Sequence, residues 1–297
     1  MNPLSNKPLL AVGKRAINQS SVNDLNRPVP GLSRRGFVTS VGLTVGAVGA
    51  FGLSGCSDSS PSSSTPTDPT STAPSVVDVL NFALNLEYLE ASFYSYIATG
   101  SGLSSADLGS GAGTITPAMK VTFSNSAVNT VAQNLAMEEI AHVQFLRSTI
   151  TAIGGTPVSA PALNLAAMGA VTSDSTFLAL ARQLEAVGVS AYAGGAQYLT
   201  SNTMAITYAA QILDTEAQHE GNLRQLCIQL GVTSPAADSL DMPPTSSQLF
   251  NTSNTTGLNP IRTTSQVLQI VYGTAGKSGV ASGGFFPSGL NGNIKTS

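Results

Sequence analysis

Histidine, tryptophan and charge are all scarce in this sequence. Its 297 residues include two histidines and no tryptophan, and 10% of them are charged. This scarcity makes Glu87 and Glu185 conspicuous, because each lies among apolar neighbours. Burying an unpaired carboxylate costs several kcal/mol or neutralises the group. Carboxylates in such stretches therefore need a partner, and a shared cation is the simplest one.

Basic side chains are scarce after the first 55 residues. Six of the 13 Lys and Arg residues and one of the 16 acidic residues precede position 56. Residues 56–297 therefore carry 7 basic and 15 acidic side chains, a formal charge of 7 − 15 = −8. An acidic body without a basic stripe argues against a nucleic-acid partner.

The N-terminal segment lacks a convincing membrane-spanning run, because residues 37–53 are too short and too rich in Gly and Thr. The run SRRGF at residues 33–37 resembles a twin-arginine export signal, and LSGC at residues 53–56 resembles a lipobox. We predict that residues 1–55 are a twin-arginine lipoprotein signal peptide and that lipid on Cys56 anchors the protein to a membrane of the bacterial cell envelope. Ordinary cleavage, or an uncleaved anchor with an incidental cysteine, is the alternative.

The other cysteine has no evident partner if Cys56 carries lipid. Cys227 lies in an apolar stretch, where a free cysteine usually acts as a small buried hydrophobe. Residues 56–74, rich in Ser, Pro and Thr, are predicted to be a flexible tether.

The two histidines belong to an internal repeat. The pattern E-x-x-H-x-x-x-L-R occurs at residues 139–147 and at residues 216–224, and a glycine follows each arginine by seven residues. Residues three apart share one face of a helix, so each copy points a carboxylate and an imidazole at the same place. Iron, manganese and zinc accept this mixture of ligands.

Two further carboxylates complete the pattern. Glu87 precedes the first copy, Glu185 lies between the copies, and each is followed seven residues later by a tyrosine, Tyr94 or Tyr192. A Glu helix and an E-x-x-H helix thus occur twice, which is the ligand scheme of dinuclear carboxylate four-helix bundles. The predicted metal ligands are Glu87, Glu139, His142, Glu185, Glu216 and His219.

Over roughly residues 75–231 these motifs resemble the ferritin-like superfamily, in particular its exported, desiccation-related members. The resemblance implies an all-α fold, an antiparallel four-helix bundle with a long crossover between its second and third helices. It also implies two iron or manganese ions, bridged by Glu139 and Glu216, with His142 and His219 each on one ion and with Glu87 and Glu185 as terminal ligands.

Three functions are compatible with this resemblance. The first is an envelope oxidoreductase that acts on dioxygen, peroxide or ferrous iron under oxidative, iron or desiccation stress. The second is a non-enzymatic protection protein whose metal is structural. The third, a subunit of an iron-storage cage, fits poorly with a lipid anchor, a tether and a long tail.

Neighbouring carboxylates compete for the ligand roles. Glu90 is the rival of Glu87, but only Glu87 repeats the spacing to a tyrosine. Glu138 is the rival of Glu139, but it aligns with Thr215 in the second repeat, so we expect it to be solvated or to support a ligand.

Four more residues could assist the site. Tyr94 and Tyr192 could donate hydrogen bonds or electrons, although tyrosines of the core are more common. Arg147 and Arg224 could pair with a ligand carboxylate, or interact with the C-terminal turn of their helix.

The predicted elements follow from periodicity and from start and stop signals. A capping box, Ser75-x-x-Asp78, begins the first helix, and Gly154 ends the second. The tail, residues 232–297, is predicted to be irregular and to wrap the bundle, with a short helix near residues 266–272. We expect helices at about 75–98, 117–153, 173–199 and 202–230, a loop at 99–117, and the crossover at 155–172.

Overall fold

The computed structural model describes residues 73–297. The predicted signal peptide, Cys56 and all but the last two residues of the predicted tether lie outside this range. No helix within residues 73–297 is both long enough and apolar enough to cross a membrane.

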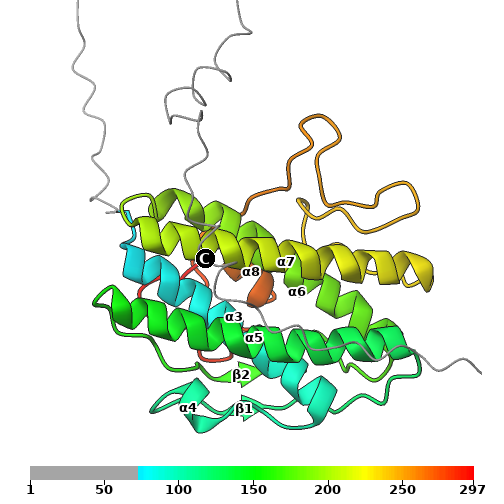
Figure 1. The fold of residues 1–297 in the computed structure, drawn as a ribbon, viewed down its shortest axis with the longest axis horizontal. Helices are drawn as coiled ribbons and strands as arrows, with labels where there is room; N and C mark the ends of the chain where they lie inside the picture. Colours follow the sequence, from blue (N-terminus) through cyan, green and yellow to red (C-terminus); the bar gives the residue numbers. More distant parts are fainter. Residues whose placement is uncertain (1–72) are drawn as a thin grey trace, which may run out of the picture. The chain divides into compact units, whose positions relative to one another are not determined.

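Four long helices form the body of the protein (Figure 1). The helices α3 and α5 pack along their lengths, as do α6 and α7, and weaker contacts of α3 with α6 and of α5 with α7 close the bundle. Gln133, near the start of α5, donates a hydrogen bond to the carbonyl of Ala98 at the end of α3, so these two helices are antiparallel. The predicted all-α bundle is confirmed. Its helices are α3 (Val76–Thr99), α5 (Ser126–Ala152), α6 (Asp174–Gly195) and α7 (Thr203–Gln229).

The predicted capping box starts α3. The backbone N–H of Asp78 donates to the Ser75 hydroxyl at 3.1 Å, and the backbone N–H of Ser75 donates to the Asp78 carboxylate at 3.1 Å. The helix ends at Gly100, whose φ of 83° suits glycine. Nearly every face of α3 from Val79 onward is buried, so α3 is the innermost helix.

The second long helix starts later than predicted. The expected start was near Pro117, but α5 begins at Ser126 because the Asn125 side chain caps it, accepting from two backbone N–H groups. Ahead of this cap the chain is tied to α3, since the Val121 N–H donates to the Ile97 carbonyl at 2.9 Å. The residues before Asn125 therefore cannot follow the helical path.

The two connections on either side of α5 pair with each other. The first, predicted as a loop, contains α4 (Ser105–Leu108) and β1 (Ile115–Thr116), and the crossover contains β2 (Leu163–Asn164). The two short strands are parallel, with Ile115 opposite Leu163. Figure 1 shows them along one side of the bundle. The crossover is otherwise free of helix, as predicted.

The second pair of helices has a short turn. Ser173 caps α6, and Asn202 caps α7 by accepting from the Ala205 N–H. The predicted third helix extends to position 199, whereas α6 ends at Gly195 and continues as a 3₁₀ turn, η2 (Ala196–Tyr198). The tail crosses α6 closely here, because a Cβ at Gly194 would lie 2.0 Å from the Arg262 carbonyl oxygen.

The tail packs on the bundle. Its helix α8 (Thr264–Val271) contacts α6, and Val267 and Leu268 are fully buried. Arg182 of α6 donates to both oxygens of Asp241 at 2.6 Å, and both side chains are inaccessible to solvent. A buried ion pair therefore joins the irregular segment to the third long helix.

This ion pair leads to a prediction about stability. Replacing Arg182 by methionine leaves Asp241 buried without its cation, so Arg182→Met should lower the free energy of unfolding by about 3–5 kcal/mol. Urea unfolding measures the change. The control is Gln183→Met, because Gln183 bonds only to its own helix, and its effect should stay within about 0.5 kcal/mol. Equal effects of the two variants would contradict the role of the pair.

Candidate metal centre

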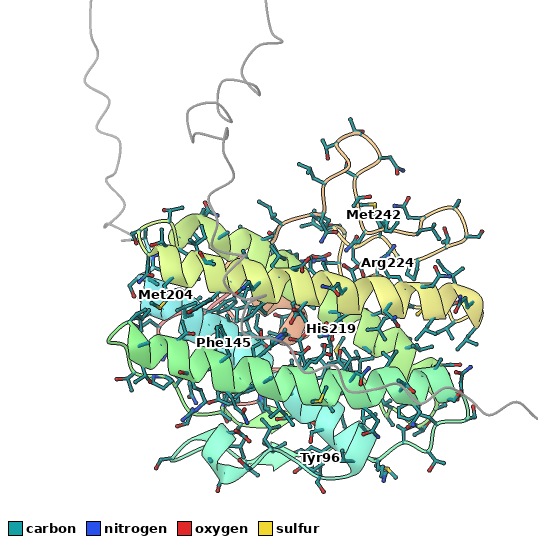
Figure 2. All side chains as sticks on the ribbon, viewed as in Figure 1. Tyr96, Phe145, Met204, His219, Arg224 and Met242 are labelled. Atoms are coloured by element: carbon teal, nitrogen blue, oxygen red, sulfur yellow. The ribbon has the colours of Figure 1, made fainter. Side chains whose placement is uncertain are left out.

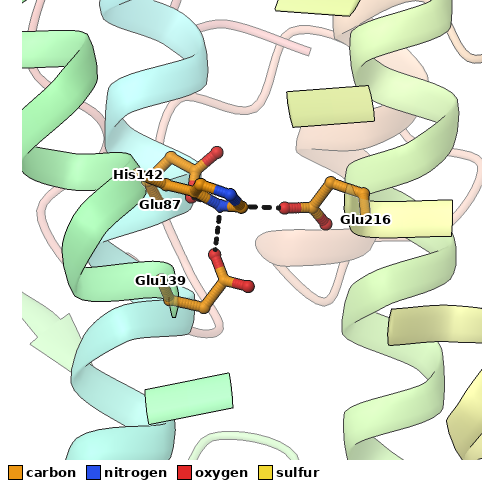
Figure 3. A group of neighbouring side chains, drawn as sticks. All are labelled: Glu87, Glu139, His142 and Glu216. Carbon is orange, nitrogen blue, oxygen red and sulfur yellow. Dashed lines mark hydrogen bonds and ion pairs between the residues drawn. The ribbon is translucent and has the colours of Figure 1, made fainter. Parts of the chain in front are cut away.

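Six side chains from the four long helices meet at the centre of the bundle. They form two overlapping groups, and within each group the possible ligand atoms lie within 4.8 Å of one another. Glu139 and Glu216 belong to both groups, and Figure 3 shows the first group. The first group is Glu87, Glu139, His142 and Glu216, and the second is Glu139, Glu185, Glu216 and His219.

The helical spacing of each E-x-x-H pair points both its carboxylate and its imidazole toward the centre of the bundle. His142 Nδ1 lies 2.9 Å from Glu139 on the same helix, 3.3 Å from Glu87 and 3.4 Å from Glu216. His219 Nδ1 lies 3.0 Å from Glu139 and 3.2 Å from Glu185. A ring nitrogen carries one proton, so neither histidine can satisfy all the carboxylates that face it.

Several carboxylate oxygens of this cluster are buried without a hydrogen bond. They are Glu87 Oε2, Glu139 Oε1 and both oxygens of Glu216. Glu139 Oε1 is close to His219 Nδ1, but that nitrogen is hydrogen-bonded to Glu185. Buried polar groups are nearly always paired, and each carboxylate of the two groups is at most 1% exposed. The buried Glu and His cluster is compatible with a dinuclear metal site.

The charges of the cluster shift its pKa values strongly. Burial raises the pKa of Glu139 to about 7 despite the opposing effect of the two imidazoles close to its carboxylate. Burial and the charges of Glu139 and Glu185 raise the pKa of Glu216 well above its usual value. Although burial disfavours the imidazolium, neighbouring carboxylates raise the pKa of His219 to about 12 and that of His142 further. Protons therefore compensate the carboxylates when no cation is bound.

Each of the two predicted tyrosines hydrogen-bonds to a carboxylate on another helix. Tyr192 of α6 donates to Glu87 of α3, and Tyr94 of α3 donates to Glu185 of α6 at 2.5 Å. Each tyrosine therefore orients the carboxylate on the opposite helix rather than the glutamate seven residues before it. These hydrogen bonds fix one oxygen of each carboxylate. The other oxygen of Glu87 has no hydrogen bond, and the other oxygen of Glu185 faces His219 Nδ1.

The two rival carboxylates have different surroundings. Glu138 lies 2.6 Å from Nε2 of His219, and its side chain is 41% exposed, so it supports the back of that imidazole from the surface. Glu90 is buried one turn beyond Glu87, outside both groups. Burial and the charges of Glu216 and Glu185 raise the pKa of Glu90 well above its usual value, which favours its neutral form.

A glycine that the sequence patterns did not single out also shapes the centre. A Cβ at Gly188 would lie 2.5 Å from Glu216 Oε2, so a larger side chain would displace this carboxylate. Gly188 follows Glu185 by three residues and therefore lies on the same face of α6. That spacing is the signal that could have identified it.

The two repeat arginines do not contact the ligand carboxylates. Arg147 donates to the Tyr88 hydroxyl at 2.6 Å and to the Val158 carbonyl at 3.3 Å, which holds the crossover. Arg224 donates to the Leu249 carbonyl at 2.7 Å in the tail, and Figure 2 shows it near the segment that carries Met242. Five residues after a histidine, the helix has turned about 140° away from the centre, so the expected pairing with a ligand is not seen.

A four-helix bundle with a Glu helix and an E-x-x-H helix in each half defines the dinuclear carboxylate class of site. The sequence model of the ferritin-like domain matches residues 75–229, and the chain belongs to this family. Among solved structures, the chain is similar to the "ferritin like, diiron-carboxylate proteins" of Bacillus anthracis str. Ames. The identity is 18%, the match covers 51% of this chain and 94% of that one, and the TM-score is 0.38. No curated protein matches.

The protonated cluster predicts how pH affects the metal-free protein. The pKa of Glu139 is about 7 in the folded state against 4.5 for a free glutamate. The stabilisation by the protonated Glu139 carboxyl is thus fully present below pH 4.5 and is lost as the pH rises through 7. This loss lowers the free energy of unfolding by roughly 3 kcal/mol. We expect the urea midpoint of chelator-treated protein to fall between pH 5 and pH 8.

The control for this prediction is Glu139→Gln, which keeps the neutral shape of the side chain at every pH. Its urea midpoint should fall less than that of the wild type over the same range. Midpoints that rise with pH in both proteins would contradict the assignment of buried, protonated carboxyls.

Proposed function

We propose that the bundle binds two transition-metal ions, iron or manganese, and reacts with dioxygen or peroxide. One observation carries this proposal: two ligand groups share Glu139 and Glu216, and one oxygen of Glu139 and both oxygens of Glu216 are buried without a hydrogen-bond partner. Glu139 and Glu216 would bridge the ions, His142 and His219 would each bind one, and Glu87 and Glu185 would be terminal ligands. Carboxylate and imidazole donors suit either metal.

The chemistry needs two electrons, since reduction of dioxygen to peroxide, or of peroxide to water, takes two electrons and two protons. A pair of redox-active ions supplies these electrons when bound. The protein holds the ligands, excludes water from carboxylates that are at most 1% exposed, and orients Glu87 and Glu185 through Tyr192 and Tyr94. Ferrous iron is itself a substrate if the centre acts as a ferroxidase.

A structural role for the metal is the second candidate. All four long helices contribute a ligand, so bound ions would cross-link the bundle and stabilise it. Oxygen-electrode and peroxide-consumption measurements on the iron-loaded protein separate the two functions. Consumption of either oxidant supports an oxidoreductase, and full occupancy without consumption supports a protein that uses its metal for stability under stress.

The stoichiometry is directly testable. Elemental analysis of protein matured in its own host should give two transition-metal ions per chain. His142→Ala and His219→Ala should each hold about one ion or none, because each removes the nitrogen ligand of one site. Less than one ion in the wild type would refute the dinuclear proposal.

Two carboxylates serve as matched controls. Glu90→Ala lies one turn from Glu87 and should retain both ions, whereas Glu87→Ala should lose occupancy. Equal losses in this pair would show that the ligand is misassigned. Glu138→Gln should lower affinity at one site by about 10–100-fold, the typical effect of losing a group that supports a metal-bound histidine.

We further propose that the protein acts in the bacterial cell envelope, exported by the twin-arginine route and held to a membrane by lipid on Cys56. The support is the signal-like sequence before Cys56. Cys56→Ser should move the protein from the membrane fraction to the soluble fraction, or leave it unprocessed, as seen by fractionation and mass spectrometry. A wild-type mature N-terminus at any other residue would contradict this proposal.

A further inference from the structure

A mostly apolar, partly open pocket of about 90 Å³ lies between α3 and α6, beneath the tail. Leu80, Ala83 and Leu86 line it from α3, and Ala191 and Tyr192 line it from α6. Ile261 of the tail completes the wall and is 60% exposed. The pocket therefore begins near solvent at the tail and extends toward the middle of the bundle.

Arg262, the one charged residue that lines this pocket, and Thr263 beside it are already engaged. The Arg262 guanidinium, which is inaccessible to solvent, donates to Asp238 and Ser190. The Thr263 hydroxyl caps α8 by accepting from the Gln266 N–H. The described residues thus offer no charged group here to a cation or to an anionic ligand, and the pocket favours an apolar occupant.

The inner wall of the pocket is also the wall of the metal centre. Tyr192 lines the pocket, and its hydroxyl donates to Glu87. Leu86, the other inner residue, directly precedes Glu87 in α3. A molecule in the pocket is therefore separated from a terminal ligand by one layer of side chains.

The opposite seam of the bundle has a contrasting character. Each helix contacts two neighbours, so the seam between α5 and α7 lies opposite the seam between α3 and α6. There the side chains of His142 and His219 are 11% and 9% exposed, and Glu138 is 41% exposed. This polar, acidic side suits the entry of cations, whereas the pocket offers them no ligand.

The size of the pocket restricts its occupant. An engineered apolar cavity of about 150 Å³ stays dry and binds benzene or xenon, so about 90 Å³ admits a diatomic gas or one xenon atom but not an acyl chain. Peroxide is disfavoured, because the mostly apolar lining replaces few of the hydrogen bonds that peroxide makes in water. We propose that this pocket binds dioxygen and supplies it to the metal centre from the Glu87 side, an inference that rests on the proposed function.

Xenon tests the pocket without any metal. Crystals of the protein under xenon pressure should show one xenon atom against Ala83 and Tyr192. Ala83→Phe, which fills the pocket, should abolish the xenon site. Ala210→Phe, which changes an exposed alanine of α7, should not. Absence of xenon from the wild-type pocket, or its retention in Ala83→Phe, would overturn the site.

Kinetics of the iron-loaded protein test the supply of dioxygen. Ala83→Phe should slow ferrous oxidation by dioxygen about tenfold or more and change oxidation by hydrogen peroxide less than twofold, with metal content and Tm verified. Ala191→Phe blocks the same pocket from α6 and replaces Ala83→Phe if that variant does not hold metal. Equal effects on both oxidants, no effect on either, or a metal-loaded wild type inert to dioxygen would refute the supply role. A wild type that binds no metal refutes the proposed function instead, while the xenon result still decides the pocket.

Discussion

Mutual repulsion among buried carboxylates is the constraint around which this bundle is built. Glu87, Glu139, Glu185 and Glu216 converge within a few ångströms, and each is at most 1% exposed to solvent. Neither histidine can neutralise the carboxylates around it with its single inward-facing proton. The centre therefore needs added positive charge, from protons in the metal-free protein or from metal ions, and the two compete for the same oxygens.

The surrounding residues hold this unfavourable arrangement in place. Tyr192 and Tyr94 orient Glu87 and Glu185, Gly188 leaves room for Glu216, and Glu138 supports His219 from the surface. The long antiparallel packing of α3 with α5 and of α6 with α7 fixes the position along the helices at which these carboxylates and histidines come together.

The segments outside the long helices are held largely by arginines. Arg147 secures the crossover, Arg224 and Arg182 secure the tail, and Arg262 pairs with Asp238 within it. Because Arg182, Arg224 and Arg262 are buried, each of the three requires a matched acceptor. The tail lies over the seam between α3 and α6 and lines the apolar pocket beside Tyr192. The two sides of the centre thereby differ in polarity.

Local patterns in the chain were enough to predict the four long helices and the six clustered side chains, and the resemblance to the ferritin-like superfamily predicted the crossover. A repeat of E-x-x-H with an intervening Glu helix encodes which faces point inward, because helical periodicity depends on nearby residues alone. The start of α5 at Ser126 was not predictable in this way, since it depends on the tie between Val121 and Ile97. The partners of Tyr94, Arg147 and Arg224 and the pocket beneath the tail also escaped prediction. They arise from contacts between residues distant in the chain, and only the packed bundle brings such residues together.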